Sequence, residues 1–114
     1  MKKKYVPCPV EATLQLLENR WRVLIIYDLI NGKKRFGELM KNITGISQRS
    51  LTSNLRTMET KGLIVRKVYA QVPPKVEYNL SSLGKSLIPI LKQMEVWGGE
   101  YKKSKFFDKT ADCK

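Results

Sequence analysis

Histidine is absent from this chain of 114 residues, and cysteine occurs only twice, as Cys8 and Cys113. The lack of histidine removes the commonest general acid–base group and the commonest metal ligand. Two cysteines at opposite ends of a chain cannot form a zinc site by themselves, and they offer no disulfide framework. The sequence also offers no nucleophile paired with a general base. We therefore expect no catalysis, no metal, no cofactor and a reducing, cytoplasmic location.

Long hydrophobic runs and acidic residues are also scarce. Pro7, Pro9, Glu11 and Gln15 interrupt the basic start of the chain, so we expect neither a signal peptide nor a membrane-spanning helix. The chain has 22 Lys and Arg against 10 Asp and Glu, which gives a net charge of +12. This balance favours a polyanionic partner, most often nucleic acid and less often an anionic membrane. A merely soluble basic protein is the plain alternative.

The spacing of the apolar residues predicts a mainly α-helical fold with a small β-hairpin. The length indicates one domain, at 8–99, between a basic arm at 1–7 and a basic tail at 100–114. In chain order the predicted elements are helix 9–17, helix 21–30, strand 33–35, helix 36–43, helix 47–61, strands 64–69 and 75–80, and a last helix capped by Ser81 or Ser82. Segment 21–30 is apolar almost all round, which predicts a buried central helix. Pro89 predicts a kink or a restart in the last helix.

The helix predicted at 47–61 has two different faces. Leu51, Leu55 and Met58 recur at helical spacing and predict a buried face. The opposite face carries residue types that suit a major groove, because arginine bridges guanine O6 and N7 and glutamine pairs with adenine N6 and N7. An ordinary solvated helix face is the alternative. The candidate DNA-reading residues are Ser47, Gln48, Arg49, Thr52, Ser53 and Arg56.

A hairpin follows this helix directly, with Pro73 and Pro74 at its tip. Prolines stiffen such a tip and keep its edges from pairing with other chains. Basic side chains on the hairpin would neutralise phosphates without reading sequence, although a plain solvated hairpin is the alternative. A helix followed at once by a twisted hairpin is typical of a winged-helix DNA-binding domain. The candidate phosphate contacts are Lys34, Arg35, Arg66, Lys67, Gln71 and Lys75.

The first and last helices carry more apolar surface than a small core absorbs, so we expect a homodimer through them. Covering the chain's own core is the alternative. Cys8 stands at the start of a helix and behind three lysines, a position that favours a reactive thiolate, whereas a small buried side chain is the alternative. Cys113 either pairs with another thiol or has no role. The candidate interface residues are Val10, Leu14, Leu83, Leu87, Ile90, Leu91, Met94 and Trp97.

A series of motifs runs over most of the chain, in order and without insertions. They are CPVEATL (8–14), WRVLI (21–25), KRFGEL (34–39), GISQRSLT (45–52), LR (55–56), GLIVR (62–66), VPPKVEYNL (72–80) and WG (97–98). Together they resemble the HxlR-type bacterial transcriptional regulators. Two departures stand out. The segment 57–61 is less acidic than is usual for this helix in the family, and the tail after Gly98 has no matching pattern.

The resemblance implies a winged helix-turn-helix protein with the order helix, helix, strand, helix, helix, strand, strand, helix. It places the DNA-reading helix at 47–61 and the wing at 69–76, and it implies dimers formed through the first and last helices. In several members the cysteine of the CPV motif senses electrophiles or oxidants, and Cys8 holds that position. We therefore expect a homodimeric operator-binding regulator, with repression favoured over activation and an oxidant or small-molecule effector conceivable. A winged-helix module that binds protein or RNA is the alternative.

Overall fold

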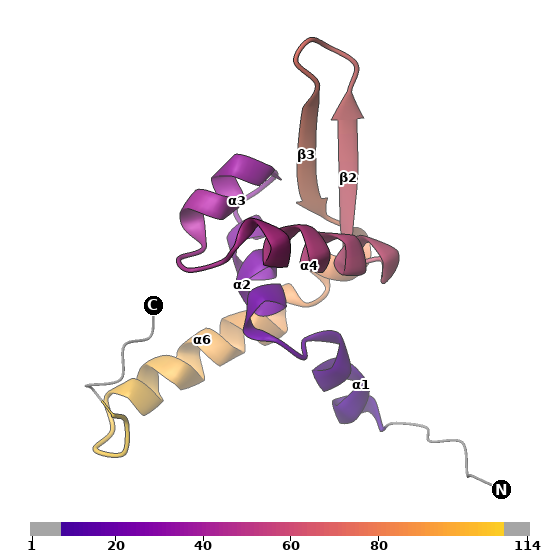
Figure 1. Ribbon diagram of the computed structural model, residues 1–114. Helices are drawn as coiled ribbons and strands as arrows, with labels where there is room; N and C mark the ends of the chain where they lie inside the picture. Colours follow the sequence, from indigo (N-terminus) through magenta and orange to yellow (C-terminus); the bar gives the residue numbers. More distant parts are fainter. Residues whose placement is uncertain (1–7, 109–114) are drawn as a thin grey trace, which may run out of the picture.

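The structure, a computed structural model, describes residues 8–108. The predicted arm at 1–7, the end of the tail and Cys113 lie outside the described residues. The elements in chain order are α1 (Pro9–Leu16), α2 (Arg20–Leu29), β1 (Lys34–Arg35), α3 (Phe36–Asn42), α4 (Gln48–Thr60), β2 (Ile64–Tyr69), β3 (Lys75–Leu80), α5 (Ser82–Lys85) and α6 (Ile88–Lys102). The strands form an antiparallel sheet in the order β1-β3-β2, and the β2–β3 hairpin projects from the helical body (Figure 1). This is the predicted winged helix-turn-helix arrangement.

The core lies between α2, α4 and one face of the sheet. Leu51, Leu55 and Met58 of α4 are buried, as their spacing predicts. The helix α2 is not buried on every side, in contrast to the prediction, because Tyr27 is 43% exposed and Trp21 is only partly buried. A domain of this size has too little volume to surround one helix completely. The core instead takes only one side of α2.

Local signals fix both ends of α4. Ser47 is the N-cap, and its hydroxyl oxygen accepts the Ser50 N–H at 3.0 Å. Gly62 follows the helix with a φ of +81°, a left-handed conformation that favours glycine. Gly84 of α5 packs so closely under Leu63 that a Cβ at this position would overlap the Leu63 carbonyl. These residues set the angle at which α4 gives way to the wing.

The predicted last helix is two helices, because the chain restarts at Pro89 rather than kinking there. The proline lies in the first turn of α6, where its missing N–H costs no hydrogen bond. The helix then continues through Gly98 and Gly99 to Lys102, so the predicted domain boundary at residue 99 falls inside it. The apolar and aromatic residues of α6 therefore belong to the folded domain over its whole length.

Aromatic contacts hold the residues after α6 against it. The rings of Trp97 and Tyr101 stack with centroids 5.3 Å apart, and Phe107 meets Tyr101 edge-on at 6.0 Å. Such pairs contribute about 0.5–1.5 kcal/mol beyond their buried area. The first part of the predicted tail is thus packed on the domain.

Candidate nucleic-acid interface

The exposed side of α4 carries the predicted DNA-reading residues. Leu51 and Met58 are 0% exposed on the inner side, which anchors the helix. Thr52 is half-buried at the edge of the outer side. Ser47 has a second role as the N-cap acceptor, which leaves its hydroxyl proton free to donate. The exposed members of the set are Ser47, Gln48, Arg49, Ser53 and Arg56.

Apart from the Ser47 cap, the functional groups on this side have no partner within residues 8–108. Among residues 8–108, no hydrogen bond or ion pair joins the side chains of Gln48, Arg49, Thr52, Ser53 and Arg56 to another residue. A helix fixed by its buried face therefore presents unengaged donors and acceptors to solvent. This combination is what base recognition requires, since both partners of a bidentate contact must be available.

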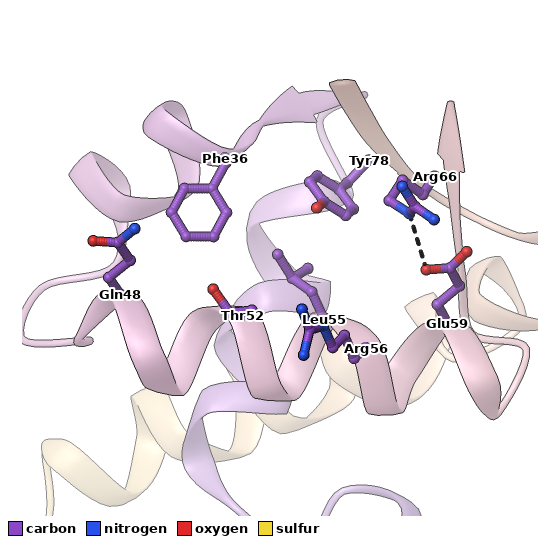
Figure 2. A pocket seen from close by; sticks show the side chains of 8 residues that line it. All are labelled: Phe36, Gln48, Thr52, Leu55, Arg56, Glu59, Arg66 and Tyr78. Carbon is purple, nitrogen blue, oxygen red and sulfur yellow. Dashed lines mark hydrogen bonds and ion pairs between the residues drawn. The ribbon is translucent and has the colours of Figure 1, made fainter. Parts of the chain in front are cut away.

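A cleft of about 440 Å³ separates α4 from the base of the wing (Figure 2). Figure 2 shows Phe36 and Tyr78 on one side of it and the α4 side chains on the other. Arg66 of β2 forms an ion pair across it with Glu59 of α4, with Nε and Oε1 3.2 Å apart. Burial raises the pKa of the Tyr78 hydroxyl above its ordinary value, so this group remains a neutral donor.

The basic residues of the wing fall on two faces, which their order in the sequence did not reveal. Arg66 lies opposite Tyr78 in the hairpin, whereas Lys67 lies opposite Glu77. Opposed residues share a face and adjacent residues alternate. Arg66 thus faces the α4 cleft, and Lys67 and Lys75 lie on the other face.

That other face holds a cluster around Tyr69 and Glu77. The ammonium groups of Lys67 and Lys75 lie 4.9 and 4.7 Å from the centre of the Tyr69 ring. Lys33 and Lys75 each place Nζ 3.5 Å from a Glu77 carboxylate oxygen. A hydrogen bond from Tyr69, and then the charges of the two lysines, lower the pKa of Glu77 against the opposing effect of burial. Lys33 was not among the predicted phosphate contacts, because only the register of the sheet brings it here.

The other predicted phosphate contacts have different surroundings. Lys34 is half-buried, and its ammonium donates to the carbonyl oxygens of Asp28 at 3.3 Å and Gly32 at 3.5 Å. Its charge therefore stabilises the carboxyl end of α2, and its phosphate contact stays a prediction. Arg35 and Gln71 are exposed, Gln71 at the tip of the hairpin.

A buried polar link, which the sequence analysis missed, joins α4 to the α1–α2 junction. Arg22 and Asn54 are each 8% exposed. Arg22 Nε donates to Asn54 Oδ1 at 3.4 Å, and its Nη1 donates to the Leu16 carbonyl at the end of α1 at 3.1 Å. Asn19 donates to the same Asn54 oxygen at 3.1 Å. An asparagine three residues from Leu51, on the buried side of α4, was the signal available in the sequence.

The predicted dimer residues separate into three groups. Leu87 and Leu91 are 8% and 3% exposed because they pack in the core of their own chain, so their assignment to an interface is wrong. Leu83 lies apart from the others, beside Gly62 at the end of α4. The remaining exposed apolar residues lie on α1 and α6, at the end of the molecule away from the wing (Figure 1). They are Val10, Leu14, Ile90, Met94 and Trp97.

Cys8 is exposed at the N-cap position of α1, so it is not the small buried side chain of the alternative interpretation. Its thiol donates to a carboxylate oxygen of Glu11, with Sγ and Oε1 3.7 Å apart. The thiol is therefore open to solvent on a helix that also carries the exposed Val10 and Leu14.

Comparison with known proteins assigns the chain to a family of transcriptional regulators. The profile of the HxlR-like helix-turn-helix family matches residues 16–106. The chain belongs to this family. It is 50% identical over 95 residues to YdeP of Bacillus subtilis (strain 168), an uncharacterized HTH-type transcriptional regulator. The aligned segment covers 83% of this chain and 74% of YdeP.

The solved structures that are similar to this HxlR-like regulator include two from redox and transcriptional regulators. The reduced form of the redox regulator HypR has a TM-score of 0.81 and 45% identity, over 84% of this chain and 95% of HypR. The reduced form of the transcriptional regulator YodB from B. subtilis has a TM-score of 0.74 and 34% identity, over 90% of this chain and 100% of YodB. The chain is thus a DNA-binding winged-helix transcriptional regulator rather than an enzyme. No helix within residues 8–108 is long and apolar enough to cross a bilayer.

Proposed function

We propose that this HxlR-like regulator binds an operator as a homodimer, reads bases through the exposed side of α4 and represses transcription. The observation that carries the proposal is the set of unengaged polar side chains on a helix whose other side is buried. Arg49 suits guanine and Gln48 suits adenine, whereas Arg56 lines the cleft at the base of the wing, where a phosphate suits it. Contacts with phosphates would fix the register and orientation of each subunit on the DNA. The residues proposed for these contacts are Arg35, Arg66, Lys67, Gln71 and Lys75.

The apolar residues of α1 and α6 support a homodimer. Trp97 is 69% exposed, Val10 is 69% exposed and Leu14 is 63% exposed. A monomer that left such side chains in water would carry an unusual apolar surface. Pairing through these helices would set two α4 helices about 34–36 Å apart, which is one turn of DNA.

Selection of bound fragments from genomic DNA tests the operator proposal. We expect a two-fold symmetric site whose half-site spacing matches the dimer. Binding to random duplex DNA should weaken as salt rises, with a slope near −0.9 per phosphate contact. Flat or absent binding would favour the alternative, a winged-helix module for protein or RNA contacts. Location of the operator over a promoter supports repression, and increased transcription by the bound protein would contradict it.

Light scattering tests the dimer. We expect the wild type and Val65→Glu, a control on the wing surface, to be dimers at micromolar concentration. Met94→Glu places a charge in the proposed interface and should yield monomers, because an unpaired buried charge is strongly unfavourable. A monomeric wild type would exclude this arrangement.

Thiol sensing by Cys8 is a second proposal, favoured by the exposure of its thiol on α1 and by the similarity to the redox regulator HypR. The thiolate would attack a peroxide oxygen, giving a sulfenic acid and releasing hydroxide. Operator affinity before and after mild peroxide should change in the wild type and in Cys113→Ser, but not in Cys8→Ser. An equal response of wild type and Cys8→Ser would make Cys8 structural.

A further inference from the structure

Glu59 is an acidic side chain on the side of α4 that faces the cleft, in a protein with a net charge of +12. It lies in the last turn of α4, where the helix dipole is negative and a carboxylate is unfavourable. It would also repel the phosphates of any DNA bound along α4 and the wing. Neither helix stability nor attraction to DNA accounts for a glutamate at this position.

The contacts of Glu59 indicate its role. Its carboxylate pairs with Arg66 at 3.2 Å (Figure 2). The side chains of Glu59 and Arg66 remain 40% and 45% exposed. Arg56 and the hydroxyl of Tyr78 line the same cleft. The guanidinium groups of Arg56 and Arg66 and the neutral phenol of Tyr78 thus surround one solvent-open space. The Glu59 carboxylate is paired with one of these guanidinium groups, that of Arg66. The same donors that hold a carboxylate suit a phosphate, because arginine binds both in the same geometry.

We propose that the cleft between α4 and the wing is a seat for a DNA backbone phosphate, and that Glu59 is a built-in competitor for that seat. This inference rests on the proposed operator binding. In the free protein Glu59 neutralises Arg66. On binding, a phosphate takes over Arg66 and adds Arg56 and the Tyr78 hydroxyl, and the carboxylate turns back to solvent. The exchange is reversible and forms no covalent bond.

The consequence is a lower affinity for DNA of any sequence. A strongly basic protein binds random DNA through phosphates, and this background limits its useful specificity. Because Glu59 competes with a phosphate, it weakens the complexes with all DNA sequences by the same factor. Only an operator that adds base contacts along α4 then binds well. Glu59 then acts as a repulsive element in the sense that partner discrimination requires.

Titration of labelled random-sequence duplex DNA at fixed salt tests the proposal, with Glu59→Gln compared with the wild type. We expect Glu59→Gln to bind this DNA more tightly than the wild type. The loss of an exposed ion pair of this kind corresponds to about a three-fold gain in affinity per subunit, or about ten-fold for a dimer with both subunits on DNA. Glu100→Gln is the matched control. It removes the same charge from an exposed pair, with Lys103 at 3.7 Å, on the helix that runs away from the wing (Figure 1). It should change the affinity less than about two-fold.

The same titration in an Arg66→Gln background separates competition from general charge. There the gain from Glu59→Gln should fall to less than about two-fold, because no guanidinium is released. An equal gain in both backgrounds, or a loss of affinity in Glu59→Gln, would overturn the proposal. If the wild type itself fails to bind DNA, the proposed function fails instead, and that outcome is seen in the first titration. Circular dichroism of each variant confirms that it is folded.

Discussion

The helix α4 and the wing are adjacent and both polar on the outside, but they hold their functional groups in different ways. On α4 the side chains of Gln48, Arg49 and Arg56 have no hydrogen-bond or ion-pair partner among residues 8–108. On the wing, Arg66 pairs with Glu59, and Lys75 pairs with Glu77. These three side chains of α4 are therefore ready to bind without losing any contact, whereas Arg66 and Lys75 of the wing must exchange partners. We infer that α4 provides selectivity and that the wing provides adjustable attraction.

The largest expected effect concerns stability and separates the anchored helix from the projecting wing. Leu51→Ala removes a side chain that is 0% exposed and should lower the free energy of unfolding by about 2–5 kcal/mol. Val68→Ala, on a wing residue that is 55% exposed, should change it by less than about 0.5 kcal/mol. Urea unfolding measures both. Similar losses in the two variants would mean that the wing is as much part of the core as α4.

The next effect concerns the operator. Arg49→Ala should weaken operator binding by about 1–3 kcal/mol and leave random DNA nearly unaffected, because a base contact is lost. Lys67→Ala should weaken binding to the operator and to random DNA by a similar factor. It should also reduce the dependence of affinity on salt by about the amount of one phosphate contact. Fluorescence anisotropy with operator and random duplexes measures all four affinities. If Arg49→Ala reduced both equally, Arg49 would contact only phosphate and the division between helix and wing would not hold.

The sequence predicted the parts of this comparison that local signals determine. The helix predicted at 47–61 is α4 with its cap Ser47, and the strands at 64–69 and 75–80 have the predicted bounds. A capping serine, a left-handed glycine and alternation along the strands act within a few residues, so they can be identified without the fold.

The partners of the polar side chains could not be predicted in the same way. The contact of Arg22 with Asn54 spans 32 residues, and that of Lys33 with Glu77 depends on the register of β1 against β3. The inward turn of Leu87 and Leu91 depends on their packing in the core of their own chain. Periodicity identifies an apolar stripe but does not say whether a second chain or the same core covers it.

The Arg22–Asn54 link tests whether α4 is held in place by more than its apolar face. Asn54→Ala leaves Arg22 and Asn19 without their shared acceptor and should lower the free energy of unfolding by about 1–2 kcal/mol. Asn42→Ala is the control, because within residues 8–108 the side chain of this exposed asparagine donates only to Asp28, at 3.1 Å, and it should cost less than about 0.5 kcal/mol. Equal stability of Asn54→Ala and wild type would mean that only the apolar face of α4, formed by Leu51, Leu55 and Met58, holds the helix in place.

The smallest expected effect concerns the outer face of the wing and appears only in acid. Folding lowers the pKa of Glu77, because Tyr69 donates a hydrogen bond to its carboxylate and Lys33 and Lys75 lie beside it. The unfolded chain therefore takes up this proton first as the pH falls. The stabilisation is complete above the ordinary glutamate pKa of about 4.3 and is lost as the pH falls through the lower folded-state pKa.

Thermal unfolding at neutral and acidic pH measures this effect. Glu77→Gln should lower the melting temperature slightly at neutral pH and should reduce the loss of stability between neutral pH and the acid range. Lys33→Gln should give part of the same change, because it removes one of the two charges that favour the carboxylate. If wild type and Glu77→Gln lost the same stability in acid, the lysines of this face would not be held by Glu77. They would then be as available to DNA as the arginines of α4, and the contrast between helix and wing would be confined to the Glu59–Arg66 pair.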